Sequence, residues 1–201
     1  IYATLTPGHA RCHSGADVVI EGPGESKILA LMSEILGDRE VRADEFTALE
    51  SMPFPAFELL GDLETLPLLT SRGCSWNCSF CATPHLYPRL EQRSPQSVVD
   101  EIQDDVRRLG TKNIAFYDDA LLLRKESHIL PILREVVERE IRVDFHTPNG
   151  LHIREIDLGA ASLFRRAGVR TLYLSQESFD QALLQRSCPK VSPGDLGRAL
   201  A

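Results

Sequence analysis

From residue 66 onward, short apolar runs alternate with longer stretches whose apolar residues recur at helical spacing. The runs are LPLLT, NIAFYDD, RVDFHTPNG and RTLYLSQES, which centre near residues 69, 115, 144 and 173. After the first gap they recur about every 29 residues, the length of one strand with its helix. This spacing predicts parallel strands joined by right-handed helical crossovers, and therefore an α/β fold.

Helices are expected between these strands. The first covers SPQSVVDEIQDDVRRLG, with Ser94 as N-cap, Pro95 at the first helical position and Gly110 after the end. The next two cover ESHILPILREVVERE and DLGAASLFRRAG, and RVDFHTPNG is expected to run from a strand into a turn. The apolar side chains of the first helix predict its buried face: Val98, Ile102, Val106 and Leu109.

The chain before this region has a different pattern. DVVI at 17–20 predicts a short strand, and the residues after EGPGES predict a helix that ends before Gly37. No period continues beyond Gly37, and three prolines follow, which indicates a linker. The expected parts are the end of an α/β domain at 1–37, a linker at 38–65 and a larger α/β domain at 66–201.

Composition and charge narrow the classes of partner. With 201 residues, 43% hydrophobic and 25% charged, the chain has the composition of a globular domain. It has neither an apolar leader nor an apolar run near the roughly 20 residues that span a bilayer, so we expect a cytoplasmic protein without a membrane partner. A net charge of −7 does not favour nucleic acid, which leaves small-molecule or protein partners.

Three of the five cysteines lie in TSRGCSWNCSFCATP, as Cys74, Cys78 and Cys81 with the spacing C-x3-C-x2-C. An odd count and this tight spacing argue against a disulfide scaffold and for metal binding or catalysis in a reducing compartment. A structural zinc site uses four ligands, and no second C-x2-C is present. A [4Fe-4S] cluster also uses four cysteines, so three would leave one iron open to a ligand.

Polar residues follow each predicted strand: SRGC, YDDA, FHTPNG and SQES. Ligand sites of parallel sheets lie at the carboxyl ends of the strands, so these segments and the cysteines are expected to share one site. His146 and Asn149 would face its mouth, although TPNG is also a good turn sequence.

The pattern Cys74, Cys78, Phe80, Cys81 resembles the signature of the radical S-adenosylmethionine (SAM) superfamily, which sets an aromatic residue before the third cysteine. RSPQSVVDEI, FYDDALL, TPNGL and SQES look like the branch that includes methylthiotransferases and cobalamin-dependent members. The resemblance covers about residues 64–201 and implies a six-unit barrel, of which this chain shows about four units.

The resemblance implies a cluster on the three thiolates, with SAM chelated by the open iron. An electron from a donor such as flavodoxin or ferredoxin would then cleave SAM to a 5′-deoxyadenosyl radical, which takes hydrogen from a substrate. Phe80 would contact the adenine, and Asp118 or Asp119 would accept the SAM ammonium group. Ser175 and Glu177 would take the ribose hydroxyls or another polar group of SAM.

These polar residues also have purely structural interpretations. Asp118 and Asp119 can end a strand and cap a turn, and Glu177 can pair with an arginine of a neighbouring helix. Arg93 can hold an anion or pack its stem, and Cys12 and Cys188 are most simply free thiols.

The first 26 residues resemble the carboxyl-terminal end of the cobalamin-binding domain that precedes the barrel in one class of the family. The D-x-H-x-x-G loop that supplies the cobalt ligand is absent, so cobalamin is expected only in a full-length parent. His9, Cys12 and His13 also suggest a metal site, but the resemblance explains GHARCH without one.

The sequence therefore predicts a radical SAM enzyme of the cobalamin-associated class, present as an incomplete chain with an unknown substrate. The alternatives are a methylthiotransferase-type enzyme without cobalamin, a non-catalytic zinc-binding or interaction module, and an inactive fragment. An open sheet edge is expected after the fourth strand.

Overall fold

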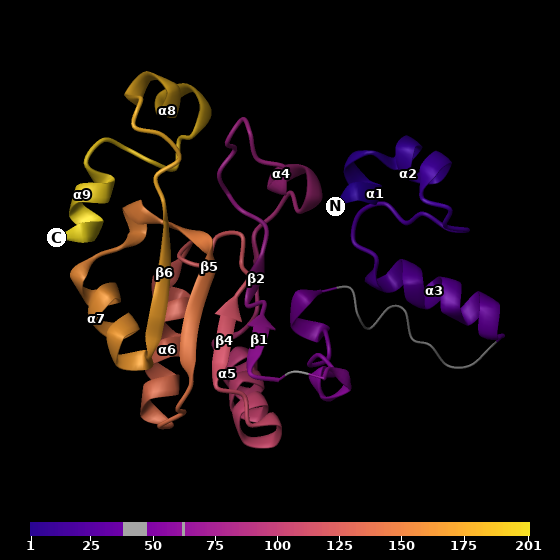
Figure 1. The fold of residues 1–201 in the computed structure, drawn as a ribbon, viewed down its shortest axis with the longest axis horizontal. Helices are drawn as coiled ribbons and strands as arrows, with labels where there is room; N and C mark the ends of the chain where they lie inside the picture. The colour runs from indigo at the N-terminus through magenta and orange to yellow at the C-terminus, as the bar shows by residue number, and fades with distance from the viewer. Residues whose placement is uncertain (38–47, 62) are drawn as a thin grey trace.

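A four-stranded parallel sheet forms the centre of the computed structural model, which describes residues 1–37, 48–61 and 63–201. The strand order is β1-β4-β5-β6, and each neighbouring pair is parallel, as the sequence predicts. The strands rise side by side in Figure 1, with their carboxyl ends at the top. Their bounds are Thr65–Leu68 (β1), Asn113–Phe116 (β4), Asp144–His152 (β5) and Val169–Ser175 (β6).

Three helices cover one face of this sheet: α5 (Pro95–Asp104), α6 (Ile129–Glu138) and α7 (Leu158–Ala167). Their apolar sides pack on alternate strand residues, and the rings of Phe116 and Phe145 stack with centroids 5.1 Å apart. The opposite face carries the polar and half-exposed strand residues. The helices therefore leave one face of the sheet free for a site.

Shorter elements surround this core. They are α1 (Tyr2–Leu5), α2 (Pro7–His13), α3 (Glu25–Leu36), η2 (Leu49–Ser51), η3 (Phe57–Leu59), β2 (Ser71–Arg72), α4 (Thr83–Leu86), β3 (Glu91–Gln92), η5 (Lys125–Ser127), η6 (Ile153–Glu155), α8 (Gln181–Ser187) and α9 (Asp195–Leu200). The two short strands β2 and β3 pair antiparallel on either side of the cysteine segment.

Two helix starts are capped by side chains, at Ser94 as predicted and also at Asp157. The Ser94 hydroxyl accepts the backbone N–H of Ser97, and the Asp157 carboxylate accepts that of Ala160 at 2.8 Å. These bonds satisfy amide groups that the first turn of a helix leaves without a partner.

The amino-terminal part differs from the prediction. Residues 17–20 form no strand, although α3 follows as expected. The apolar residues of α3 are largely exposed, because no sheet lies against them in the described residues. Residues 38–47 and 62 of the predicted linker lie outside the described residues, so the division at 37 and 65 stays a prediction.

The expected open edge is present. β6 pairs only with β5 among the described strands, and its Leu172 and Tyr173 are exposed.

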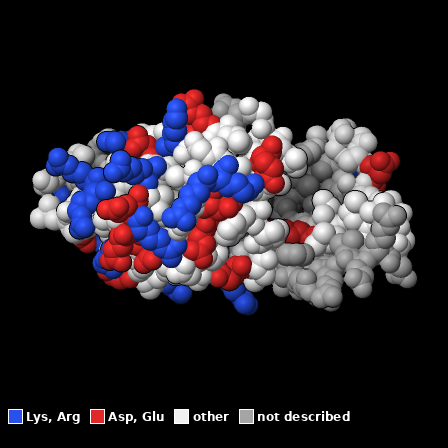
Figure 2. All heavy atoms as spheres, turned by 90° about the horizontal axis from the view of Figure 1, so that it is seen from below, with Lys and Arg blue, Asp and Glu red and all other residues white. Residues whose placement is uncertain are grey.

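The view from below, toward the amino ends of the strands, shows Lys and Arg interspersed with Asp and Glu (Figure 2). None of the described helices is long and apolar enough to cross a membrane.

The helix after Ser94 changes its geometry before it ends. Residues Asp105–Leu109 form a π-helix, and this wider turn rotates the following side chains. Val98 and Ile102 are fully buried as predicted, but Val106 and Leu109 are only partly buried and Asp105 is 3% exposed. Burial, with the nearby charge of Glu101, raises the pKa of Asp105 to about 7.

Replacing Asp105 with asparagine is expected to stabilise the chain at pH 8, by on the order of 1–3 kcal/mol. A raised pKa means that folded Asp105 holds a proton that the unfolded chain releases between about pH 4 and 7. Its contribution to stability is therefore greatest below about pH 4 and falls as the pH rises through 7. Urea unfolding from pH 4 to 8 measures the free energy of unfolding of the variant and the wild type. The stability gained by Asp105→Asn should fade toward pH 4, and the exposed control Asp17→Asn should show no such trend.

Candidate active site

The three clustered cysteines lie on a loop directly after β2, at the carboxyl edge of the sheet (Figure 1). Cys78 is buried, and Cys74 and Cys81 are partly buried. The backbone N–H of Trp76 donates to Cys74 Sγ and that of Thr83 donates to Cys81 Sγ, each at 3.4 Å. The loop therefore presents sulfur atoms that already accept amide hydrogen bonds, and we name residues 73–82 the cysteine loop.

Gly73 starts this loop in a conformation that suits only glycine. Its φ is +85°, and a Cβ at this position would lie 2.3 Å from the carbonyl oxygen of Arg89. A side chain here would collide with rigid backbone rather than with a flexible side chain. The approach of the Arg89 carbonyl thus fixes where the cysteine loop leaves the sheet.

Asp119 ties the cysteine loop to the end of β4. Its Oδ2 accepts the N–H of Gly73 at 2.8 Å, and its Oδ1 accepts the Thr83 hydroxyl at 3.3 Å. These two residues flank the three cysteines in the chain. Asp119 itself is exposed, so its carboxylate is open to a ligand as well as bound to the loop.

Asp118, unlike its exposed neighbour Asp119, is buried and only 2% exposed. Its Oδ1 accepts the hydroxyls of Thr70, at 2.6 Å, and Ser71, at 2.5 Å. Thr70 gives its single proton to Asp118, so the 2.8 Å contact with His128 is a donation from His128 Nε2. Burial raises the pKa of Asp118 and lowers the pKa of His128 to about 4, which keeps the imidazole neutral. This network joins the end of β1 to the end of β4.

Replacing Asp118 with alanine is expected to lower the free energy of unfolding by about 2–4 kcal/mol, because two buried hydroxyls lose their acceptor. Asp119→Ala is the matched control, since it removes an exposed carboxylate one residue away and should cost less than about 1 kcal/mol. Urea unfolding measures both. Equal losses in the two variants would contradict the assignment of Asp118 as the buried structural residue.

The TPNG segment is not the turn that its sequence favours. β5 continues through it to His152, with an irregular register against β6 between Thr147 and Leu151. The Asn149 amide donates to the carbonyl oxygens of Tyr117, at 2.9 Å, and Asp118, at 3.3 Å. Asn149 thus binds the end of β4, which explains why a turn residue lies in a strand.

His146 also connects strands, on the free face of the sheet. Its two ring nitrogens contact the Thr171 hydroxyl at 3.0 Å and Asn113 Oδ1 at 3.1 Å. For Arg93 the sequence allowed either anion binding or packing. In the structure this residue forms a buried ion pair with Glu101. Both residues therefore have partners within the chain.

The end of β6 carries the other two predicted SAM contacts. Ser175 pairs with His152 of β5, and a Cβ on Gly150 would lie 1.7 Å from its hydroxyl oxygen, so the two strands approach closely there. Glu177 has a φ of +65° and forms an ion pair with Lys190 at 2.7 Å, rather than with an arginine. Burial alone would lower the pKa of Lys190, but this pair raises it.

Two buried polar atoms beside this ion pair have no hydrogen-bond partner among the described residues: His152 Nδ1 and Gln176 Oε1. Burial, with the charges of Lys190 and Arg154, lowers the pKa of His152 to about 4, so its ring is neutral. Buried polar atoms normally find partners, so these two atoms are open to a hydrogen bond from a water molecule or a ligand. Sequence analysis missed His152 and Lys190, because no local motif marks them, and it placed Gln176 only within the SQES segment.

The roles in SAM binding that the sequence assigns to Phe80, Asp118, Asp119, Ser175 and Glu177 stay predictions. The structure brings Asp119 to the cysteine loop, and Ser175 and Glu177 to the end of β6. Phe80 is 59% exposed on the cysteine loop, where its ring is free to stack on a ligand.

The donor set suits an iron–sulfur cluster better than a single ion. Among the described residues, no group of three or more His, Cys, Asp or Glu side chains converges on one point where a metal ion would fit. A cubane cluster does not need such convergence, because each cysteine binds a different iron. Soft thiols that accept amide hydrogen bonds, on one loop, match its usual ligands. His9, Cys12 and His13 form no such group either.

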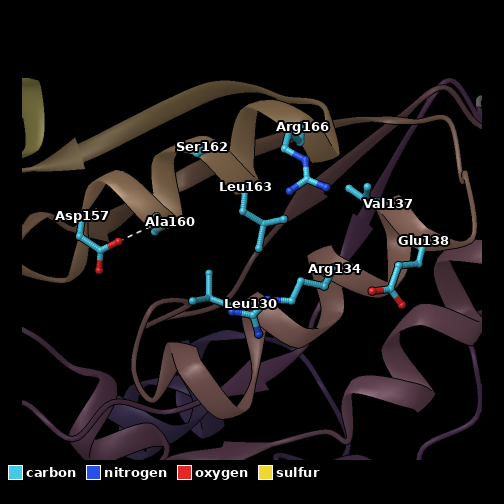
Figure 3. A pocket seen from close by; sticks show the side chains of 10 residues that line it. Leu130, Arg134, Val137, Glu138, Asp157, Ala160, Ser162, Leu163 and Arg166 are labelled. Atoms are coloured by element: carbon cyan, nitrogen blue, oxygen red, sulfur yellow. Dashed lines mark hydrogen bonds between the residues drawn. The ribbon is translucent and has the colours of Figure 1, made fainter.

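A separate groove lies in the helix layer between α6 and α7 (Figure 3). Leu130, Leu163 and Val137 line it together with the arginines Arg134 and Arg166. None of its lining residues comes from the cysteine loop or the strand ends. The groove is therefore distinct from the candidate site.

A comparison with protein families decides the classification. The model of the radical SAM superfamily matches residues 68–200, which include the whole cysteine loop and all three strand ends that follow.

The chain belongs to the radical SAM superfamily. Enzymes of this superfamily use a [4Fe-4S] cluster and SAM, as the resemblance of the cysteine pattern implies. The chain is 26% identical over 130 residues to the hopanoid C-3 methylase of Methylococcus capsulatus, and covers 24% of that protein. It is 29% identical over 124 residues to the cytidylyl-2-hydroxyethylphosphonate methyltransferase of Streptomyces wedmorensis, and covers 23% of it. These alignments take in 65% and 61% of this chain, which thus spans about a quarter of the curated relatives it matches.

The fold is also that of a solved radical SAM enzyme. The chain superposes on the radical SAM methyltransferase TsrM from Kitasatospora setae, a structure with cobalamin and a [4Fe-4S] cluster bound, with a TM-score of 0.59 and 24% identity. The match covers 67% of this chain and 27% of TsrM. It confirms the partial radical SAM barrel expected from the sequence.

Proposed function

We propose that this radical SAM chain holds a [4Fe-4S] cluster on Cys74, Cys78 and Cys81 and binds SAM beside it. The observation that carries the proposal is the cysteine loop itself: three thiols at the carboxyl edge of a parallel sheet, two of them accepting backbone N–H groups. Amide hydrogen bonds stabilise the charge on cluster sulfurs. The chemistry that a bound cluster supplies is one-electron cleavage of SAM, with the electron coming from a donor such as flavodoxin or ferredoxin.

The surrounding residues have distinct tasks in this proposal. Asp119 holds both ends of the cysteine loop and is the better candidate for the SAM ammonium group, because Asp118 is buried and already accepts two hydroxyls. Ser175 and Glu177 bind the ribose or another polar group of SAM from the end of β6. Phe80 covers the adenine. Asp118 and His128 position the strand ends and touch no ligand.

The reaction of the parent protein is proposed to be methyl transfer with cobalamin. The relatives are named as methylases or methyltransferases, and TsrM is described with cobalamin bound. A methylthiotransferase, a zinc-binding module and an inactive fragment remain the competing outcomes. The substrate is not identified.

SAM binding tests the proposal. After anaerobic reconstitution with iron and sulfide, equilibrium dialysis with labelled SAM should show about one SAM per chain, bound at least tenfold more tightly than by the cluster-free chain. Asp119→Asn should weaken binding by roughly tenfold or more, because a charge-assisted hydrogen bond is lost. Glu138→Gln, a change of an exposed residue at the carboxyl end of α6, is the control. Equal SAM affinity with and without cluster would contradict the proposal.

A further inference from the structure

A fourth cysteine lies against the cysteine loop. Cys188, which follows α8, places its Sγ 3.8 Å from Sγ of Cys78. The two residues are 110 positions apart in the chain, so only the fold brings them together. Cys188 is 0% exposed and Cys78 is 5% exposed.

The backbone holds these two cysteines as neighbours. The N–H of Ser79 donates to the carbonyl oxygen of Ser187 at 2.9 Å. These residues stand directly after Cys78 and directly before Cys188, so the hydrogen bond joins the two chain segments beside the thiols. The proximity of the sulfur atoms is thus set by main-chain contact and not by one side-chain rotamer alone.

The apolar surroundings also fix the pair. Cys78 and Cys188 belong to a small buried cluster with Ile153, Leu184 and Val191. Among the described residues, the contact between the two sulfurs is the hydrogen bond recorded for either thiol, and the charges of Lys190 and Glu177 act on Cys188 from nearby. Cys74 and Cys81 instead accept N–H groups of their own loop.

We propose that Cys78 and Cys188 form a reversible disulfide in the cluster-free chain, and that this disulfide withdraws Cys78 from cluster assembly. A disulfide needs its sulfurs about 2.05 Å apart, so the two sulfur atoms must approach by roughly 1.7 Å. The consequence for the cluster rests on the proposed function, whereas disulfide formation itself does not.

The oxidant is a low-molecular-weight disulfide of the glutathione class. The thiolate of Cys78, which at 5% exposed is the less buried of the pair, attacks one sulfur of this reagent and releases one small thiol, which leaves a mixed disulfide on Cys78. The thiolate of Cys188 then attacks Sγ of Cys78 and releases the second small thiol. Two protein thiols are oxidised to one disulfide, one reagent disulfide is reduced to two thiols, and two protons pass to those thiols.

Peptide mapping tests this step directly. The iron-free chain is treated with oxidised glutathione without oxygen, remaining thiols are blocked with N-ethylmaleimide, and the protein is digested with trypsin without reduction. Cleavage after Arg72, Arg89, Arg186 and Lys190 gives peptides 73–89 and 187–190. We expect these two peptides as one cross-linked species that dithiothreitol separates. Cys188 found reduced, or carrying only glutathione, would overturn the proposal.

Single replacements locate the link on the three-cysteine peptide. The cross-link should persist in Cys74→Ser and Cys81→Ser and disappear in Cys78→Ser and Cys188→Ser. Cys12→Ser, which removes the exposed distant cysteine, is the control and should leave it unchanged. Persistence in Cys78→Ser would assign the bond to another cysteine and would contradict the proposal.

Iron uptake tests the consequence. Oxidised wild type should take up at least fivefold less iron than reduced wild type, and dithiothreitol should restore its uptake. Cys188→Ser lacks the thiol that resolves the mixed disulfide, so its oxidised form should carry glutathione on Cys78 instead of the cross-link. Lower uptake by reduced Cys188→Ser than by reduced wild type would make Cys188 a ligand and overturn the switch. Failure of even the reduced wild type to load iron would contradict the proposed function, and the peptide map would still decide the disulfide.

Discussion

Replacing Cys74, Cys78 and Cys81 together with alanine is expected to reduce bound iron after reconstitution from about four atoms per chain to near zero. The reason is that these thiols are the proposed cluster ligands, and no other group of three or more His, Cys, Asp or Glu side chains among the described residues could replace them. Iron and sulfide analysis after desalting measures the loss, and the absorption of the cluster near 400 nm should vanish with it.

The control for this triple replacement is Cys12→Ala, because Cys12 is exposed on α2 and lies outside the cysteine loop. It should retain the full iron content. The triple variant keeps the sheet and its helices, so its circular dichroism spectrum should match that of the wild type. Full iron content in the triple variant, with its fold intact, would show that the cluster ligands are elsewhere.

Gly73→Ala is expected to lower cluster loading at least fivefold while the sheet remains folded. Its Cβ would meet the Arg89 carbonyl oxygen at 2.3 Å, far inside contact distance, so the start of the cysteine loop has to move. Small displacements of ligand residues weaken a metal site strongly, because the ligands must keep their mutual geometry.

Gly194→Ala is a closely matched control. Gly194 shares the φ of +85°, but a methyl group added there would have no atom within 4 Å, so its replacement adds backbone strain without a collision. Both variants should lose on the order of 1 kcal/mol to this strain, and only Gly73→Ala should lose iron. Equal iron loading in the two variants would contradict the role of the Arg89 contact.

The parallel sheet could be predicted because each strand and helix has its own local signal. NIAFYDD and RTLYLSQES are short apolar runs with polar ends, and Ser94 and Asp157 are ordinary N-caps. The strand expected at 17–20 did not form. A βα unit is stable only against neighbouring strands, and none lies there in the described residues.

The π-helix at Asp105–Leu109 was not predictable from helical spacing, since an inserted residue shifts the periodicity only locally. TPNG was misjudged for a related reason. Its residues favour a turn, but pairing with β6 and the Asn149 bonds to the end of β4 hold it in a strand. Tertiary contacts override local propensity in both cases.

The cysteine loop was predictable because its chemistry is concentrated in eight residues of sequence. The burial of Asp118 and the exposure of Asp119 were not predictable. Adjacent strand-end residues point to opposite sides, and only the fold shows which one is buried. Lys190, His152 and Cys188 reach the site from distant segments. No spacing rule connects such residues before the chain is folded.

The most direct test of a SAM site at the cluster is the electron paramagnetic resonance spectrum of the reconstituted, dithionite-reduced chain, recorded with and without SAM. Our account predicts the signal of a reduced [4Fe-4S] cluster that shifts when SAM is added, because SAM takes the iron position that three cysteines leave open. A cluster signal that SAM leaves unchanged would contradict SAM binding at the open iron. The absence of any cluster signal, with zinc bound instead, would contradict the enzyme assignment of this chain.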